Sequence, residues 1–171
     1  NNAVNRFLSL FVDNPSWFFD VEHVTVVNAG VIILLQLVVS KIVQRAPALP
    51  TMIVGIGFGT LGMAILSFSD SPWLFIVGIM TFTLGEMTAH PKYNSYIGMI
   101  APPDKKALYM GYSFLYGVIG SSIGGFIGAA LYVKYVEEMA NPSAFYLIFA
   151  SLGLFSMIAL ILYNKFWKSV K

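Results

Sequence analysis

The stretch that decides the fold is residues 73–100, WLFIVGIMTFTLGEMTAHPKYNSYIGMI. It is almost entirely apolar and exceeds the roughly 20 residues that a membrane-spanning helix needs. Glu86 lies 13 residues after Trp73 and 14 before Ile100. Because a helix rises about 1.5 Å per residue, the Glu86 carboxylate would sit about 20 Å from each end. We therefore expect an acid close to the middle of the bilayer.

An acid at that depth indicates a function, because burying it costs about 2.5–3.5 kcal/mol on insertion scales. His90 follows four residues later on the same helix face. Pro91 removes a backbone hydrogen bond and predicts a break in the helix. An acid, an imidazole and a break at one depth are typical of a proton or substrate pathway. The structural alternative is an acid that pairs with a base on another helix only for assembly.

The whole composition favours an all-α, polytopic membrane protein. The chain is 57% hydrophobic and 11% charged, whereas soluble domains carry about 25% charged residues. Five apolar stretches, each near or above spanning length, predict five transmembrane helices: 24–43, 51–68, 73–100, 107–133 and 143–163. Helix starts are predicted at Asp70-Ser71-Pro72, Pro102-Pro103-Asp104 and Asn141-Pro142-Ser143. We expect residues 1–171 to be one partial bundle of a longer protein, with 4–12 the end of a sixth helix.

The basic residues predict the orientation, because cytoplasmic loops carry an excess of Lys and Arg. With the N-terminus outside, the segments on the outer side hold two basic residues, Arg6 and Lys134. The inner segments then hold seven: Lys41, Arg45, Lys105, Lys106, Lys165, Lys168 and Lys171. We expect a multi-pass protein of a bacterial inner or plasma membrane, with its C-terminus in the cytoplasm.

Several classes of function are disfavoured by what the sequence lacks. There is no cysteine, no HExxH motif and no G-x-S-x-G motif, and there are only two histidines. These residues cannot form a usual zinc site or a catalytic thiol, so we expect no metal, no cofactor and no enzyme activity. The net charge of +2 gives no reason to expect a nucleic-acid partner.

Two glycine patterns are interpreted as packing signals. Gly57, Gly59 and Gly62 match G-x-G-x-x-G, but they lie inside a spanning stretch, without the strand that a dinucleotide site needs. We interpret them as small residues that allow close helix contact. The row Gly120, Gly124 and Gly128 predicts a second contact face, because small residues let helix backbones approach in lipid. A sliding contact that opens an access path is the functional alternative for this row.

Polar residues within the spans suggest a cavity. Asn28 and Gln36 are eight residues apart on one helix face, and they predict either an interhelical hydrogen bond or a cavity lining. Tyr93, Asn94 and Tyr96 make the inner half of the central stretch polar, as suits a water-filled cavity. Lys92 is expected to point away from His90 and to reach the interface.

The third and fourth stretches also carry a resemblance. The residues that carry it are Leu84-Gly85-Glu86, Pro91, Ala101-Pro102, Met110-Gly111, Phe114-Leu115 and Gly120. They resemble the tenth and eleventh helices of the major facilitator superfamily, and within it those of the proton-dependent oligopeptide transporters. Residues 27–34, VNAGVIIL, look like the eighth helix of that family. The chain departs from the pattern at Ala29, His90 and Ser113, where the family has Pro, Ser and Trp.

The resemblance implies helices eight to twelve, most of the C-terminal six-helix bundle of a carrier. It implies proton-coupled symport of a small polar solute, a di- or tripeptide as first guess, with the N-terminal half of the same carrier and the lipid bilayer as partners. A sugar, a drug or an organic ion is the alternative substrate, and a non-transporting receptor or subunit is the alternative class. The residues expected to bind the proton or solute are Glu86, His90, Asn28, Gln36, Asn94, Tyr112 and Tyr116.

Overall fold

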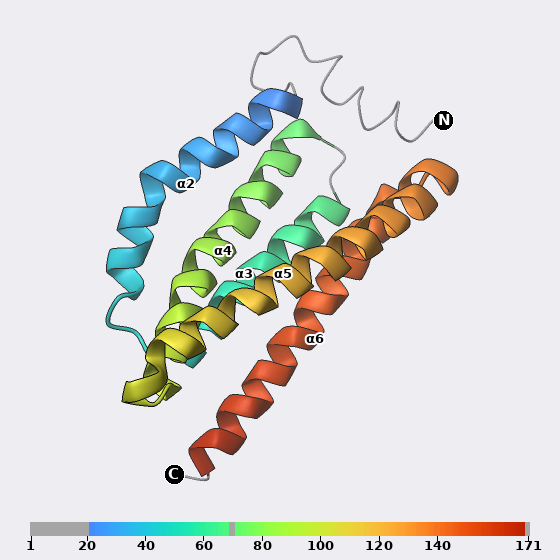
Figure 1. Ribbon diagram of the computed structural model, residues 1–171. Coiled ribbons are helices and arrows are strands. Elements are labelled where there is room, and N and C mark those ends of the chain that lie inside the picture. Colours follow the sequence, from blue (N-terminus) through green and yellow to red (C-terminus); the bar gives the residue numbers. More distant parts are fainter. Residues whose placement is uncertain (1–20, 69–70, 170–171) are drawn as a thin grey trace.

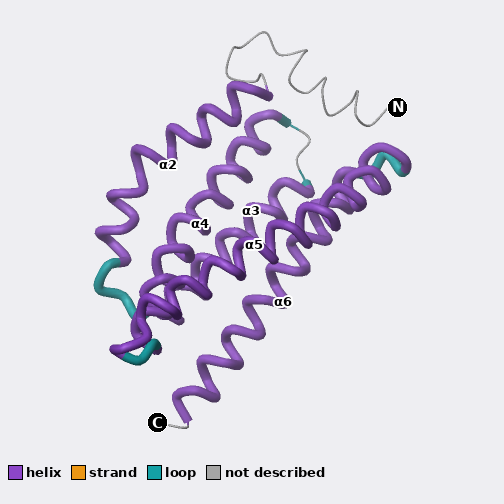
Figure 2. Tube along the Cα trace, in the orientation of Figure 1, coloured by secondary structure: helices purple, strands orange, loops and turns teal. Residues whose placement is uncertain are grey.

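The computed structural model describes residues 21–68 and 71–169, and the side chains of residues 29–68 and 71–166. It contains five long helices: α2 (Val21–Val43), α3 (Ala48–Ser67), α4 (Pro72–Ile100), α5 (Lys106–Leu131) and α6 (Pro142–Ser169) (Figure 1). A 3-10 turn at Pro103–Lys105 precedes α5, and a π-helical segment at Tyr132–Glu138 follows it. Figure 2 shows helices and short connections, and no strand, in these residues. The predicted all-α fold is confirmed, whereas stretch 4–12 lies outside the described residues.

The helices have the length and the surface of membrane spans. Four helical runs are long and apolar enough to cross a membrane: Ala48–Ser67, Pro72–Ile100, Pro103–Glu138 and Pro142–Phe166. The described part of α2 adds the shorter apolar run Ala29–Val43. Many large apolar side chains point outward, and Leu37 and Phe126 are each 79% exposed. Exposure of such a surface to water is unfavourable, so we expect lipid or the rest of a membrane protein to cover it.

Two of the three predicted helix starts have the expected cap. The Ser71 hydroxyl accepts a hydrogen bond from the Leu74 N–H at 3.3 Å, with Pro72 as the first helical residue. The Asn141 side-chain oxygen accepts from the Ala144 N–H at 3.1 Å. The same prediction for α5 was wrong, because no side chain caps that helix. Asp104 lies inside the 3-10 turn and so does not occupy the capping position.

The helix break predicted at Pro91 was also wrong. α4 continues through Pro91 from Pro72 to Ile100. Proline removes one N–H donor, and a membrane helix tolerates this loss when neighbouring helices support it. α2, α3 and α5 all contact α4, which gives the helix that support.

The contact between α3 and α4 is made by glycines. A Cβ atom added at Gly55 would lie 2.7 Å from the Ala89 backbone nitrogen, and one added at Gly62 would lie 2.6 Å from the Phe82 backbone nitrogen. Neither distance leaves room for a methyl group, so the two backbones touch because side chains are absent. This contact confirms the packing interpretation of Gly62 in the G-x-G-x-x-G stretch.

The other two glycines of that stretch also lie in helix contacts. A Cβ at Gly59 would be 3.8 Å from the Phe82 ring of α4, and one at Gly57 would be 3.5 Å from the Met157 sulfur of α6. On α6, Gly153 faces the Thr60 side chain of α3. α3 is therefore held between α4 and α6.

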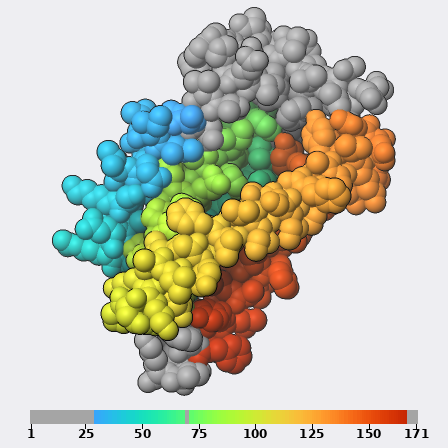
Figure 3. Space-filling model, in the orientation of Figure 1, coloured from blue at the N-terminus to red at the C-terminus, as the bar shows by residue number. Residues whose placement is uncertain are grey.

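The arrangement leaves α4 at the centre of one face. α2 and α6 lie at the two sides of the molecule in Figure 1. The space-filling view shows the α4 surface between α2 and α5 (Figure 3). The α2–α3 connection, the α4–α5 connection and the end of α6 gather at one end of the molecule (Figure 1). The described basic residues of the predicted inner side lie in or near these segments: Lys41, Arg45, Lys105, Lys106, Lys165 and Lys168.

Lys92 reaches the predicted inner end of the bundle, but protein and not solvent surrounds its side chain there. Its side chain is only 6% exposed. Its ammonium donates hydrogen bonds to the carbonyl oxygens of Gln44 at 3.1 Å and Ala46 at 2.8 Å. These carbonyls follow the C-terminal end of α2, where unpaired carbonyls and the helix dipole favour a cation. Lys92 thus ties α4 to the α2–α3 connection.

Candidate functional site

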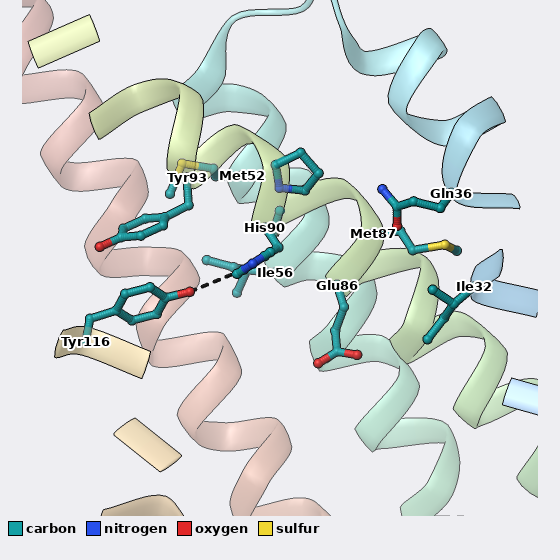
Figure 4. A pocket seen from close by; sticks show the side chains of 11 residues that line it. Ile32, Gln36, Met52, Ile56, Glu86, Met87, His90, Tyr93 and Tyr116 are labelled. Atoms are coloured by element: carbon teal, nitrogen blue, oxygen red, sulfur yellow. Dashed lines mark hydrogen bonds between the residues drawn. The ribbon is translucent and has the colours of Figure 1, made fainter. Parts of the chain in front are cut away.

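A cavity of ≈ 680 Å³ opens between α2, α3, α4 and α5, and we call it the central cavity (Figure 4). Its volume is within the range of about 300–1,000 Å³ that is usual for small-molecule sites. Its lining comes mostly from α4, with single contributions or pairs from the other helices: Ile32, Gln36, Met52, Ile56, Glu86, Met87, Ala89, His90, Pro91, Tyr93 and Tyr116.

Glu86 is the acid of this cavity. It lies 14 residues after the first residue of α4 and 14 before the last, which makes it the middle residue of the helix. Its side chain is exposed in the described chain, so the cavity and not a packed core surrounds it. In Figure 4 the carboxylate extends from α4 between His90 and Ile32. Among the described residues none forms a hydrogen bond or an ion pair with the Glu86 carboxylate.

His90 lies one turn after Glu86 on the same face of α4, and both side chains line the central cavity. The Nδ1 atom of His90 is 3.4 Å from the Tyr116 hydroxyl of α5, and Figure 4 shows the imidazole directed toward this phenol. Which group donates depends on the imidazole tautomer. The Tyr116 ring also packs against Tyr93 in a tilted arrangement, with ring centroids 4.3 Å apart and an angle of 56° between the rings. These contacts bring α5 to the cavity.

Four of the seven residues expected to bind a proton or solute line the central cavity: Glu86, His90, Gln36 and Tyr116. The Gln36 amide donates a hydrogen bond to the Ser40 hydroxyl at 2.9 Å. Asn94 and Tyr112 are not among the lining residues, and the Tyr112 side chain is 59% exposed. The side chain of Asn28 lies outside the described residues.

The second glycine row remains a prediction. A Cβ added at Gly120 or Gly124 meets no atom within 4 Å, and one at Gly128 would be 3.7 Å from the Phe149 ring of α6. The described part of this chain therefore provides a neighbour only at Gly128. Any close partner for the rest of the row has to come from elsewhere.

Tyr93 lines the cavity, in keeping with the polar half-helix that the sequence indicated, although it was not among the residues expected to bind a proton or solute. Its position near the acid also follows from the sequence, because it lies seven residues after Glu86 and three after His90, spacings that share a helix face. Sequence reasoning missed the apolar lining from Met52, Ile56 and Met87. The residues of α3 gave no such signal, since that helix is apolar on every side. In the described ranges, no group of three His, Asp or Glu side chains is arranged to hold a metal ion.

Fold and cavity together define a class: a multi-pass helical membrane protein with an acid and an imidazole facing a cavity near the middle of a span. The comparison with protein families gives the family. The chain belongs to the Major Facilitator Superfamily, whose family model matches residues 17–169.

One similar protein is YqjV, named an uncharacterized MFS-type transporter, from Bacillus subtilis (strain 168). The two sequences are 30% identical over 101 residues, which cover 57% of this chain and 25% of YqjV. The chain thus matches about a quarter of the length of this relative. No solved structure matches the chain.

Proposed function

We propose that this chain supplies helices eight to twelve of a secondary transporter that works by alternating access. Membership of the Major Facilitator Superfamily supports this assignment, and so does the resemblance of the Glu86 and Met110 segments to helices ten and eleven of its peptide transporters. In carriers of this fold, two helical bundles move about a site near the bilayer midplane. The N-terminal half of the same protein would provide the second bundle and close the central cavity.

The observation that carries the proposal is the position of Glu86. An acid at the middle of a spanning helix is costly, and it persists where a cavity supplies water or a ligand. Here the acid faces the central cavity, with His90 one turn away. A carboxylate in this position binds a proton from one side of the membrane and releases it to the other when the cavity changes its opening. We propose that this exchange drives symport of a small solute.

The first solute to test is a di- or tripeptide, because the resemblance is to peptide transporters. Its ammonium group would pair with Glu86. Sugars, drugs and organic ions are the alternatives. The orientation that places the C-terminus in the cytoplasm is part of the proposal, supported by the basic residues at one end of the helices.

The decisive experiment uses the full-length protein in proteoliposomes with an imposed pH gradient. Accumulation of alanyl-alanine, a hexose and an organic cation is measured for the wild type, Glu86→Gln and the control Glu137→Gln. Glu137 is an exposed acid of the π-helical segment, away from the cavity lining. Glu86→Gln keeps the shape of the side chain but cannot ionise, so gradient-driven accumulation should be abolished, while Glu137→Gln should behave as wild type.

Counterflow exchange separates two roles of the acid. If Glu86 binds only the proton, exchange of labelled for unlabelled solute survives in Glu86→Gln. If Glu86 also binds the solute, counterflow exchange and gradient-driven accumulation are both reduced in Glu86→Gln. Unchanged gradient-driven accumulation in Glu86→Gln would make Glu86 a structural acid. Absence of transport from a folded wild type, with solute binding retained, would favour the receptor alternative.

A further inference from the structure

The central cavity has a charge composition that restricts its ligand. Glu86 is the carboxylate of the lining, His90 is its imidazole, and no Lys or Arg is among the lining residues. The buried ammonium nearest in sequence, that of Lys92, is held by the Gln44 and Ala46 carbonyls. No described residue donates a hydrogen bond to Glu86, so its oxygens keep their accepting capacity. A carboxylate in surroundings of low polarity is stabilised most by a cation that comes with the ligand.

The aromatic side of the cavity also suits a positive charge. Tyr93 and Tyr116 both line it, and their rings are in contact. The face of an aromatic ring carries negative potential and attracts organic cations, most strongly where water is excluded. Cationic groups placed between Glu86 and this tyrosine pair would be attracted by both.

Apart from Gln36 and His90, the rest of the lining is apolar and adaptable. Met52 and Met87 present flexible thioethers, while Ile32, Ile56 and Pro91 offer no hydrogen-bonding side-chain group. Such a surface binds an apolar body and adjusts to its shape. It offers little to a sugar, whose many hydroxyl groups need polar partners on all sides.

We propose that the central cavity selects organic cations in which one positive charge is attached to an apolar body. This inference rests on the proposed transport function and names its substrate class. An anion of the same shape is disfavoured by Glu86. A zwitterionic dipeptide, the first solute suggested by the resemblance, is disfavoured as well, because its carboxylate finds no Lys or Arg among the lining residues that this chain supplies.

Two ions of one shape and opposite charge provide the test. Tetraphenylphosphonium is a cation and tetraphenylborate an anion with nearly the same apolar body. Binding of each, and of alanyl-alanine, is measured by scintillation proximity on the purified full-length protein. The wild type should bind tetraphenylphosphonium saturably and should bind tetraphenylborate and alanyl-alanine at least about tenfold more weakly. Glu86→Gln should weaken binding of the cation by about tenfold or more, and Glu137→Gln should leave it unchanged.

The tyrosine pair has its own test. Tyr116→Phe keeps the ring and should keep cation binding within about twofold, whereas Tyr116→Leu should weaken it by about fivefold or more. Monodisperse elution and an unchanged midpoint of thermal unfolding verify that each variant is folded. Equal binding of the two tetraphenyl ions, or unchanged cation binding in folded Glu86→Gln, would overturn the inference.

The result of these binding measurements does not depend on whether transport is coupled to protons. Saturable cation binding that needs Glu86, without any gradient-driven uptake, would support the ligand class and contradict the proposed transport. Glu86-dependent uptake of alanyl-alanine, with no binding of tetraphenylphosphonium, would support transport and overturn the cation class.

Discussion

The hydroxyl of Tyr116 on α5 lies 3.4 Å from Nδ1 of His90 on α4. Most of α5 is exposed, and a Cβ added at Gly120 or Gly124 meets open space. The Tyr116–His90 contact therefore joins α5 to the helix that carries the cavity acid. A movement of α5 would change the surroundings of His90, and through it those of Glu86. In the proposed transport cycle, this contact would link opening of the cavity to proton exchange at Glu86.

A double-mutant cycle on His90 and Tyr116 measures this contact. The hydrogen bond is long, and interhelical bonds in membranes average about 0.6 kcal/mol. We expect Tyr116→Phe and His90→Ala to show a coupling near that value in the free energy of unfolding. The pH profile of transport should change in both single variants. Strict additivity, with an unchanged pH profile in Tyr116→Phe, would mean that the contact has no role.

The glycine contact between α3 and α4 should not accept a methyl group. In Gly62→Ala the new Cβ would lie 2.6 Å from the Phe82 backbone nitrogen, so one backbone has to move. Overpacking of this kind costs about 1–3 kcal/mol. Thermal unfolding and the folded yield in detergent measure the effect. Gly98→Ala is the matched control on α4, since a Cβ there meets nothing within 4 Å. Equal stability of the two variants would contradict the described contact.

Lys92 should stabilise the end of α2. Lys92→Met keeps most of the side-chain volume but leaves the Gln44 and Ala46 carbonyls without their donor. Hydrogen bonds from charged donors are worth about 1.5–3 kcal/mol, and we expect a loss in that range. The exposed Lys105 provides the control as Lys105→Met. A wild-type unfolding midpoint in Lys92→Met would show that the two bonds add nothing.

The row Gly120, Gly124 and Gly128 is predicted to contact a helix outside the described chain. Gly124→Leu should then lower the folded yield of the full-length protein or hold the carrier in one conformation. Protease accessibility and transport report the two effects. Wild-type yield and transport in Gly124→Leu would indicate that this part of α5 faces lipid.

The orientation can be tested by cysteine labelling, because this chain contains no native cysteine. Helix α5, which begins at Lys106, and the π-helical segment after it separate Lys105 from Asn141. In a full-length background without other cysteines, a membrane-impermeant maleimide added outside should label Asn141→Cys and not Lys105→Cys. The reverse pattern would invert the topology, and labelling of both positions from one side would contradict the span.

The amino-acid sequence was enough to predict the helical fold, the caps at Ser71 and Asn141, and the acid near the middle of α4. Each of these follows from local information: apolar length, a capping side chain before a helix, and a residue count along the chain. Helical spacing also put Glu86 and His90 on one face. The peptide resemblance came from sequence too, and the substrate it implies remains a proposal.

Only the tertiary structure decided which surfaces meet. α3 is apolar all round, so its pattern could not reveal that Gly62 contacts α4 while Met52 and Ile56 line the cavity. Nor could the sequence place Lys92, whose acceptors are more than 45 residues away along the chain. The break predicted at Pro91 failed for a related reason, since neighbouring helices support α4 through that point. The hydropathy of a segment shows only that it avoids water. Which helix it packs against depends on the shapes of the two helix surfaces and on their hydrogen-bond donors, and these come together only when the helices pack.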